Sequence, residues 1–351
     1  MMKIVIGTVQ VPFVTGGAEF LARNLKNALC EAGHEAEIVT MPFIDSPLPR
    51  IEEHIVAARL MDQEWSWGGR ADLMIGLKFP AYYMPHPNKV VWALHQHRAA
   101  YDLYNTEFSN IKNDAEGRRI RAIIKKADEL YLPEAKRLYT IADNVTNRMQ
   151  RFNTGLQAQT LYHPCPDMEQ FYTGEYENYI LMPSRINITK RQMLALEALA
   201  LSKSDIKLCI VGKAEAEYEK NRMLRFIKEK NLEKRVKYLD FVSQEEKLKL
   251  YANARAVLFI PRDEDYGYIT LEAMAAGKAV ITAKDSGGPL EFVDDQESGL
   301  VVDSTPQAIA QAIDRVAEEP DFALRCGERG KKKLVEMNIN WEHVVKELTK
   351  P

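Results

Sequence analysis

The chain has 351 residues, 46% of them hydrophobic and 28% charged, and a formal net charge of −3. This length exceeds the roughly 250–300 residues that one hydrophobic core usually serves, so we expect two domains. The balanced composition excludes disorder and coiled coil as the main architecture, and the small net charge excludes a global field that would recruit nucleic acid.

The first half of the chain predicts a parallel sheet covered by helices. A strand over Lys3–Gly7 leads through a loop over Val9–Gly17 to a helix over Ala18–Ala32 and a strand over Glu35–Thr40. Further apolar runs, expected as strands, lie at Leu73–Leu77, Val90–Leu94 and Glu129–Leu132. The apolar run from Ile4 to Val9 is too short for a signal-peptide core or a membrane span.

After a linker-like segment from Cys165 to Glu177, the same alternation begins again. Strands are expected at Tyr179–Pro183, Lys207–Val211, Val236–Leu239, Ala256–Ile260, Ala279–Thr282 and Gly299–Val302, and helices at Met193–Leu201, Glu215–Lys230, Gln244–Asn253, Tyr268–Ala276 and Asn340–Thr349. The sequence therefore predicts an α/β protein with two Rossmann-like, doubly wound domains facing a cleft. We place the first in residues 1–168, the second in residues 169–336 and the terminal helix in residues 337–351.

The segment Pro261–Val280 carries the strongest functional signal. Glu264 follows a buried strand, Gly267 permits a close backbone approach, and the next helix offers N–H groups to an anion near Tyr268–Thr270. Glu272 lies about one turn into that helix, where its carboxylate can accept hydrogen bonds from a ribose diol. This pattern predicts a site for a nucleoside diphosphate, although each acid alone could equally be a helix cap or a solvated side chain.

Seven residues separate Glu264 from Glu272, and this pattern resembles the hallmark of the retaining glycosyltransferases of family 4, whose two-Rossmann-domain fold is called GT-B. Glu264–Gly267 is similar to the EDFG variant of that family, and Ala273–Lys278 to its helix end. The resemblance implies a retaining hexosyltransferase of polysaccharide biosynthesis. Its donor would be a nucleotide diphosphate sugar, with a UDP-sugar favoured and GDP-mannose the second choice, and its acceptor a hydroxyl of a glycan or glycolipid.

The resemblance also implies that neither a metal nor a cofactor is required. Asp263-Glu264-Asp265 spells the DxD of metal-dependent, single-domain transferases, but those acids follow a different sheet. The four cysteines are scattered without metal-ligand spacing, which favours a reducing cytoplasm. We therefore expect a cytoplasmic protein, with the inner face of the membrane as one location open to it.

Arg185 and Lys190 lie in the loop between the first strand and the first helix of the second domain. Two cations there could offset the charge that grows on a departing diphosphate, or could be ordinary helix-start residues. The family has the same pair at this spacing, commonly followed by glycine, whereas this chain has Arg191. The presence of arginine in place of glycine at this position bears on the backbone geometry of the loop.

Two segments of the first domain complete the expected site. Gly16-Gly17-Ala18-Glu19 matches the GGAE that family members place against the donor diphosphate. Two histidines, His95 and His97, follow a buried strand, and the resemblance places His95 near the sugar, with His97 as the competing choice. The residues implied as catalytic are Glu264, Arg185, Lys190 and His95, and those implied to bind the donor are Gly16, Gly17, His97, Gly267, Tyr268, Ile269 and Glu272.

The basic stretch over residues 118–126 has an amphipathic pattern that fits either peripheral membrane contact or a solvated helix packed on its sheet. The acceptor site would be built from loops of the first domain, Phe79–Pro87 and Tyr101–Asp114. Two other functions stay open: a nucleotide-sugar epimerase of the same architecture, and a protein that binds a nucleotide sugar without turning it over.

Overall fold

The computed structural model describes residues 1–13 and 16–351 and divides the chain into two compact units. Unit 1 comprises residues 1–166 and 339–351, and unit 2 comprises residues 167–338. The loop predicted over Val9–Gly17 includes Val14 and Thr15, which lie outside the described residues.

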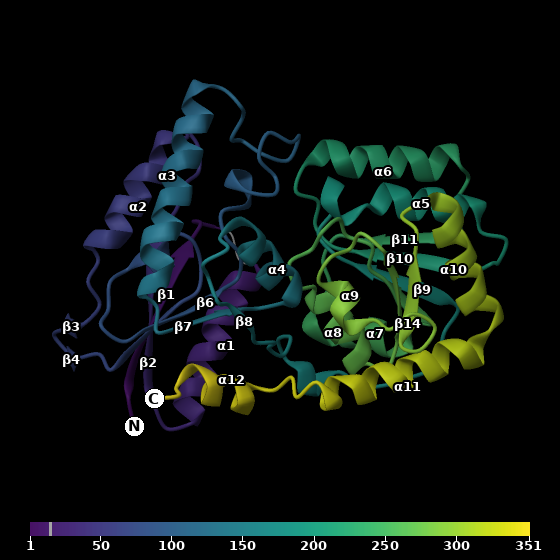
Figure 1. Ribbon diagram of the computed structural model, residues 1–351. Helices are drawn as coiled ribbons and strands as arrows, with labels where there is room; N and C mark the ends of the chain where they lie inside the picture. Colours follow the sequence, from purple (N-terminus) through teal and green to yellow (C-terminus); the bar gives the residue numbers. More distant parts are fainter. Residues whose placement is uncertain (14–15) are drawn as a thin grey trace. The chain divides into compact units, whose positions relative to one another are not determined.

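Unit 1 is built on a six-stranded parallel sheet with the strand order β2-β1-β5-β6-β7-β8 (Figure 1). Its strands are β1 (Lys3–Gln10), β2 (Glu35–Pro42), β5 (Leu73–Gly76), β6 (Lys89–Ala93), β7 (Arg137–Thr140) and β8 (Gln159–Thr160). Every residue of β5 and β6 is buried, as expected for the middle of a parallel sheet with both faces covered.

The helices of unit 1 cover this sheet. They are α1 (Gly17–Glu31), α2 (Pro49–Leu60), α3 (Ala115–Tyr131), α4 (Asp143–Phe152) and the terminal α12 (Trp341–Leu348), with the 3-10 turns η1 (Ala81–Tyr83), η2 (Arg98–Ala100) and η3 (Leu132–Glu134). A two-stranded hairpin of β3 (Trp65–Ser66) and β4 (Gly69–Arg70) lies apart from the sheet. In α1, Leu21, Leu25 and Leu29 are buried at a spacing of four, which places them on one face of the helix.

The strand predicted over Glu129–Leu132 is wrong. Residues up to Tyr131 form the last turn of α3, and the strand of this region is β7, which begins at Arg137. Ile120, Ile124 and Ala127 are buried at helical spacing, so the packing of α3 on the sheet carries the helix through this segment.

The terminal helix α12 belongs to unit 1. Asn340 caps its start by accepting a hydrogen bond from the backbone N–H of His343 at 2.8 Å. Trp341 stacks on His163 with a ring-centroid distance of 6.2 Å, and Arg137 donates to the carbonyl of Leu348 at 3.3 Å. The segment that follows unit 2 in the sequence therefore packs on the first sheet.

Unit 2 contains a second six-stranded parallel sheet, ordered β11-β10-β9-β12-β13-β14 (Figure 1). Its strands are β9 (Tyr179–Pro183), β10 (Lys207–Val211), β11 (Val236–Leu239), β12 (Ala256–Leu258), β13 (Ala279–Ala283) and β14 (Gly299–Val302). Its helices are α5 (Gln192–Leu201), α6 (Glu217–Glu229), α7 (Gln244–Asn253), α8 (Tyr268–Ala275), α9 (Pro289–Phe292), α10 (Pro306–Glu318) and α11 (Pro320–Glu336), with the 3-10 turns η4 (Met168–Gln170) and η5 (Ile188–Lys190). The prediction of an α/β chain with two doubly wound sheets is confirmed.

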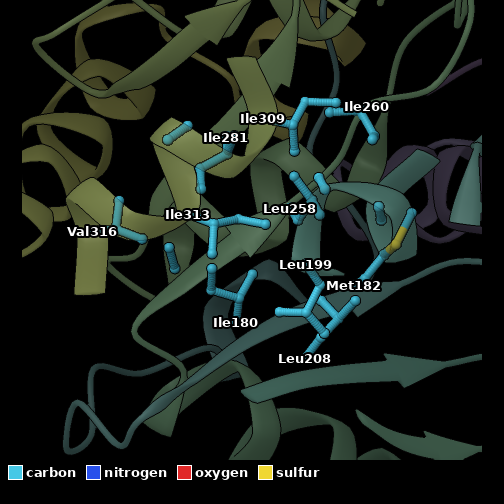
Figure 2. Close-up of a cluster of buried hydrophobic side chains, with 14 of the residues drawn as sticks. Ile180, Met182, Leu199, Leu208, Leu258, Ile260, Ile281, Ile309, Ile313 and Val316 are labelled. Atoms are coloured by element: carbon cyan, nitrogen blue, oxygen red, sulfur yellow. The ribbon is translucent and has the colours of Figure 1, made fainter. Parts of the chain in front are cut away.

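The main core cluster of unit 2 lies between its sheet and the helices α5 and α10, with further side chains from α6 and α11 (Figure 2). Branched aliphatic side chains from the strands, such as Ile180 and Ile281, meet Leu199 of α5 and Ile313 of α10. Each is at most 1% exposed, so the burial of apolar surface holds the strands and helices of this unit in place. The carboxyl ends of its strands are thereby fixed relative to one another.

The basic stretch over residues 118–126 lies on α3, and several of its cations have partners within unit 1. Arg119 forms an ion pair with Glu52 at 2.6 Å, and Arg121 donates to the carbonyl of Ala100 while lying over the ring of Tyr104. Within residues 1–13 and 16–351, every helix is too short or too polar to cross a bilayer.

Candidate functional site

Three loops meet at the carboxyl edge of the sheet of unit 2, because β9, β12 and β13 are neighbouring parallel strands. We call residues 184–191, 261–267 and 285–288 together the three-loop site. The backbone N–H of Glu264 donates to the carbonyl of Ser286 at 2.9 Å, and the N–H of Gly288 donates to the carbonyl of Glu264 at 2.8 Å. On the other side, the backbone N–H of Arg262 donates to the carbonyl of Thr189 at 2.8 Å. These bonds fix the backbone around Glu264 between the loop after β9 and the loop after β13.

Lys190 and Glu264 form an ion pair at the centre of the three-loop site. The Nζ of Lys190 donates to the Oε2 of Glu264 and lies 5.4 Å from the ring centroid of Phe259. The side chain of Lys190 is 12% exposed and that of Glu264 is 29% exposed, so a ligand could reach both. Asn187 fixes the backbone at this position by accepting a hydrogen bond from the N–H of Lys190 at 3.0 Å.

Arg185 lies in the same loop but in a more open position. Its guanidinium pairs with Glu215 at 2.7 Å, and its side chain is 63% exposed. The amide of Gln192, at the start of α5, donates to the carbonyl of Arg185 at 2.9 Å. An exposed ion pair has a small net stability, so Arg185 can leave Glu215 for an anionic ligand at little cost.

Gly267 caps the N-terminus of α8 with φ of 95° and ψ of 69°, in the left-handed region that favours glycine. A Cβ at this position would lie 3.0 Å from the ring of Phe259 and 3.1 Å from Pro289. The next residues, Tyr268 and Ile269, are half-buried and form the first turn of α8. The first-turn N–H groups of a helix carry partial positive charge, which is suited to a phosphate.

Glu272 lies one turn into α8 and is only 6% exposed. Its carboxylate accepts hydrogen bonds from the hydroxyl of Tyr251 and from the Nζ of Lys247, the latter at 2.6 Å. A carboxylate has about four lone-pair positions, so these two donors leave capacity for a further hydroxyl group. Both donors come from α7, which the sequence interpretation did not connect to the site, although their spacing of four places them on one helix face.

In unit 1, Gly16 and Gly17 mark the start of α1. The backbone N–H of Gly16 donates to the Oε2 of Glu19 at 2.8 Å, which closes a cap at the N-terminus of the helix. Gly16 has φ of −150°, an extended conformation that any residue can adopt. A Cβ at Gly16 would lie 3.7 Å from the Oε2 of Glu19, an ordinary contact, so the described residues of unit 1 do not by themselves require glycine at this position.

His95 and His97 follow β6 but have different surroundings. His95 is half-buried, and its Nδ1 lies 2.6 Å from the carbonyl oxygen of Gln96. His97 is 9% exposed and packs against Phe43 and Phe79, with a centroid distance of 5.0 Å to the latter. Its Nε2 is buried and has no hydrogen-bond partner among the described residues. A ligand therefore reaches His95 more readily than His97.

A buried carboxylate that the sequence did not reveal anchors the loop of these histidines. Asp128 of α3 accepts hydrogen bonds from the amide of Gln96 at 2.7 Å and from the hydroxyls of Tyr83 at 2.5 Å and Tyr101 at 2.6 Å. Burial raises the pKa of Asp128, while the hydrogen bonds from Tyr101, Tyr83 and Gln96 lower it. The only signal in the sequence is a carboxylate on the apolar face of a helix, next to Ala127.

The pKa of His97 gives unit 1 a pH-dependent stability. Burial lowers this pKa from 6.5 to about 4, and the nearby His95 lowers it in addition. Because the folded state holds the imidazole neutral, the contribution of His97 to the free energy of unfolding is complete above pH 6.5 and is lost as the pH falls toward 4. At pH 5 the expected loss is about 2 kcal/mol in the free energy of unfolding. Urea unfolding at pH 7 and 5 should show a larger drop for the wild type than for His97→Gln, and equal drops would contradict this assignment.

Comparison with known proteins finds similarity to one family and to several of its relatives. Residues 167–333 match the family described as glycosyl transferases group 1. The alpha-1,3/1,6-mannosyltransferase ALG2 of Homo sapiens is 28% identical over 170 residues, 45% of this chain and 41% of that protein. The N-acetylgalactosamine-N,N'-diacetylbacillosaminyl-diphospho-undecaprenol 4-alpha-N-acetylgalactosaminyltransferase of Campylobacter jejuni is 28% identical over 190 residues, 52% of this chain and 49% of that protein. The chain thus spans less than half of the length of the curated relatives that it matches.

Among solved structures, a sucrose-phosphate synthase from Thermosynechococcus elongatus superimposes with a TM-score of 0.78. The match covers 99% of this chain and 97% of that chain, at 19% sequence identity. At this identity the likeness concerns the fold, which is the two-Rossmann-domain arrangement called GT-B.

Proposed function

We propose that the protein transfers a hexose from a nucleotide diphosphate sugar to an acceptor hydroxyl, and the premise is that residues 167–333 match the family described as glycosyl transferases group 1. The observation that carries the proposal is the ion pair of Lys190 with Glu264, which lies at the carboxyl edge of a doubly wound sheet where such folds bind ligands. In the same loops Arg185 adds a second cation, and α8 adds the positive end of its dipole. Together these groups suit a diphosphate.

We propose that the donor is a UDP-sugar, with GDP-mannose as the second choice. The Homo sapiens relative is named a mannosyltransferase and the Campylobacter jejuni relative an N-acetylgalactosaminyltransferase, so the family members that this chain resembles differ in the sugar they carry. The second name also includes a diphospho-undecaprenol acceptor, which supports a lipid-linked glycan as one acceptor class here.

In the proposed reaction, the bond between the anomeric carbon and the β-phosphate oxygen breaks as the acceptor oxygen bonds to that carbon on the same face. The proton of the acceptor hydroxyl passes to the departing phosphate oxygen, so the anomeric configuration is retained and no side chain is needed as general base. Lys190, Arg185 and the N–H groups around Gly267–Ile269 stabilise the negative charge of the leaving diphosphate. We assign His95 a position beside the sugar, where its carbonyl would stabilise the cationic transition state.

The ion pair suggests how the donor is admitted. A β-phosphate would replace the carboxylate of Glu264 as the partner of Lys190, because the two anions compete for one cation. Glu264 would then be free to accept hydrogen bonds from the hydroxyls of the hexose. The site exchanges one anionic partner for another, so Lys190 keeps its charge compensated throughout.

Glu272→Gln is expected to weaken nucleoside diphosphate binding by roughly tenfold, because it removes a charged acceptor from the ribose hydroxyls. The amide keeps the size of the side chain, and Tyr251→Phe serves as the matched control, since it removes one donor to Glu272 and leaves the carboxylate. Isothermal titration with UDP and GDP measures the effect. An unchanged affinity in Glu272→Gln would show that Glu272 does not bind the ribose hydroxyls.

Activity is expected to persist in EDTA, because cationic side chains and helix N–H groups rather than a metal would meet the charge of the diphosphate. In the described part of the chain, no three His, Cys, Asp or Glu side chains are grouped in a way that could hold a metal ion. The measurement is the initial rate of sugar transfer in EDTA and after addition of Mg²⁺. Complete loss in EDTA with recovery in Mg²⁺ would show that a metal is required.

Ligand linkage offers a direct test of the proposed donor site. A nucleoside diphosphate that binds the folded protein raises its unfolding temperature, by an amount that grows with concentration and affinity. We expect UDP or GDP to raise it clearly and the matching nucleoside to raise it little, because the nucleoside lacks the diphosphate that Lys190 and Arg185 would bind. A nucleoside that stabilised the protein as well as its diphosphate would count against the proposal.

A further inference from the structure

We infer that Arg191 and Asp285 form a clamp that positions Lys190 for sugar transfer. Neither residue is assigned a role in the reaction proposed above, and neither needs to touch the donor. The inference rests on the proposed role of Lys190, which the same experiment tests separately.

The backbone at Arg191 is the first reason. This residue directly follows Lys190 and has φ of 59° and ψ of 40°, which is the left-handed region. A side chain with a Cβ is disfavoured there, and glycine is the residue that adopts this conformation without strain. The loop therefore needs some other interaction to hold a left-handed arginine between η5 and α5.

The ion pair of Arg191 with Asp285 supplies that interaction. The NH1 and NH2 of Arg191 lie 2.7 Å and 2.6 Å from the two carboxylate oxygens of Asp285, in the parallel two-bond geometry that only arginine can form. The side chain of Arg191 is 16% exposed, although it is long and charged. Hydrogen bonding from Arg191 lowers the pKa of Asp285, so the pair stays charged at neutral pH.

Asp285 is itself held in the three-loop site. Its carbonyl accepts a hydrogen bond from the N–H of Asp263 at 2.9 Å, and its carboxylate accepts a second bond from the hydroxyl of Ser304 at 3.2 Å. Asp263 directly precedes Glu264, the partner of Lys190. One residue of the loop after β13 thus holds the neighbours of both members of the central ion pair.

The two adjacent residues Lys190 and Arg191 thus have different roles. Lys190 turns toward Glu264, while Arg191 turns toward Asp285 and fixes the chain direction at this point. If the clamp is removed, the loop can leave the left-handed conformation, and the Nζ of Lys190 no longer lies where the leaving phosphate would be. A displacement of about 1 Å can cost about a hundredfold in rate, so the effect on the chemical step is measurable.

The test uses Arg191→Ala, Arg191→Gly and Asp285→Asn in the full chain, with Lys190→Ala as the reference. Arg191→Ala keeps the Cβ and loses the clamp, whereas Arg191→Gly loses the clamp but adopts the left-handed conformation freely. We expect single-turnover rates at saturating donor to fall about tenfold to a hundredfold in Arg191→Ala and Asp285→Asn, and less in Arg191→Gly. The unfolding temperature of each variant is measured alongside the rate.

A double-mutant cycle separates positioning from a general loss of stability. In the Lys190→Ala background, Arg191→Ala is expected to cause little further loss of rate, because the group that it positions is absent. Provided that Lys190→Ala lowers the rate, two results would overturn the inference. One is a rate loss from Arg191→Ala that is equally large in both backgrounds, and the other is a rate for Arg191→Ala equal to that of the wild type. If Lys190→Ala itself turns over normally, the result contradicts the role proposed for Lys190 in sugar transfer, on which the inference rests.

Discussion

Replacing Lys190 with alanine is expected to slow the chemical step by about two to three orders of magnitude, the usual cost of removing one group that stabilises a developing anion. The side chain of Lys190 is 12% exposed, and in the proposed exchange its ammonium leaves the carboxylate of Glu264 for the β-phosphate, where it faces the accumulating charge. Binding of the nucleoside diphosphate product should also weaken, because the product carries the charge that develops on the phosphate, but by less than the rate.

The control for this variant is Lys284→Ala. Lys284 belongs to the same edge of the sheet, but its side chain is 63% exposed and pairs with Asp303 at 2.8 Å. We expect normal turnover from it, since an exposed pair contributes little. Single-turnover rates and the folded fraction are measured for both variants. Near-normal turnover in folded Lys190→Ala would show that the leaving-group site lies elsewhere.

Arg185→Ala should behave like Lys190→Ala, but the effects of the two variants should not add. Both cations would bind one diphosphate, so the double variant is expected to lose less than the sum of the two single losses. Arg185 is the more exposed of the two and pairs with Glu215 in the absence of a donor. A fully additive pair would indicate that the two cations serve different groups.

Glu264→Gln is the second variant with a large expected effect, a fall of roughly a hundredfold in single-turnover rate. The amide keeps the size of the side chain but replaces the carboxylate, and so weakens the hydrogen bonds that the proposal assigns between Glu264 and the hexose. Because the backbone of Glu264 is bonded to Ser286 and Gly288, the loop should keep its conformation. The loss should therefore appear in rate rather than in folding.

Asp303→Asn is the matched control for Glu264→Gln, because Asp303 is an acid of unit 2 whose side chain is 64% exposed and pairs with Lys284. The measured quantities are the single-turnover rate and the donor affinity of both variants. A rate for Glu264→Gln equal to that of Asp303→Asn would remove Glu264 from the reaction. A lower donor affinity with an unchanged rate would restrict its role to binding.

The strands and helices of unit 2 were largely predictable because its buried strands are short apolar runs separated by polar helices. Strands β9 and β10 and helix α7 have the bounds expected from the sequence. The error at Glu129–Leu132 shows the limit of this reasoning. The short apolar run Leu130–Leu132 at the end of a helix looks like a strand until the packing of the whole of α3 is known.

The site was predictable in its chemistry but not in its contacts. Polar residues after buried strands indicated that Lys190 and Glu264 would share an edge of the sheet, yet nothing local shows that two residues 74 positions apart form an ion pair. The clamp of Arg191 was hidden for the same reason. The sequence showed an arginine where the family commonly has glycine, and only the structure shows its left-handed backbone and its partner Asp285.

The most direct test of the central claim is incubation of the protein with a panel of UDP- and GDP-sugars, with the sugar product identified by NMR. The proposed function predicts that one donor yields its nucleoside diphosphate together with a transferred or slowly hydrolysed sugar of retained anomeric configuration, and that Lys190→Ala abolishes most of this product. An epimerised nucleotide sugar, or a donor that binds and is recovered unchanged with every acceptor, would contradict the claim that this protein is a glycosyltransferase.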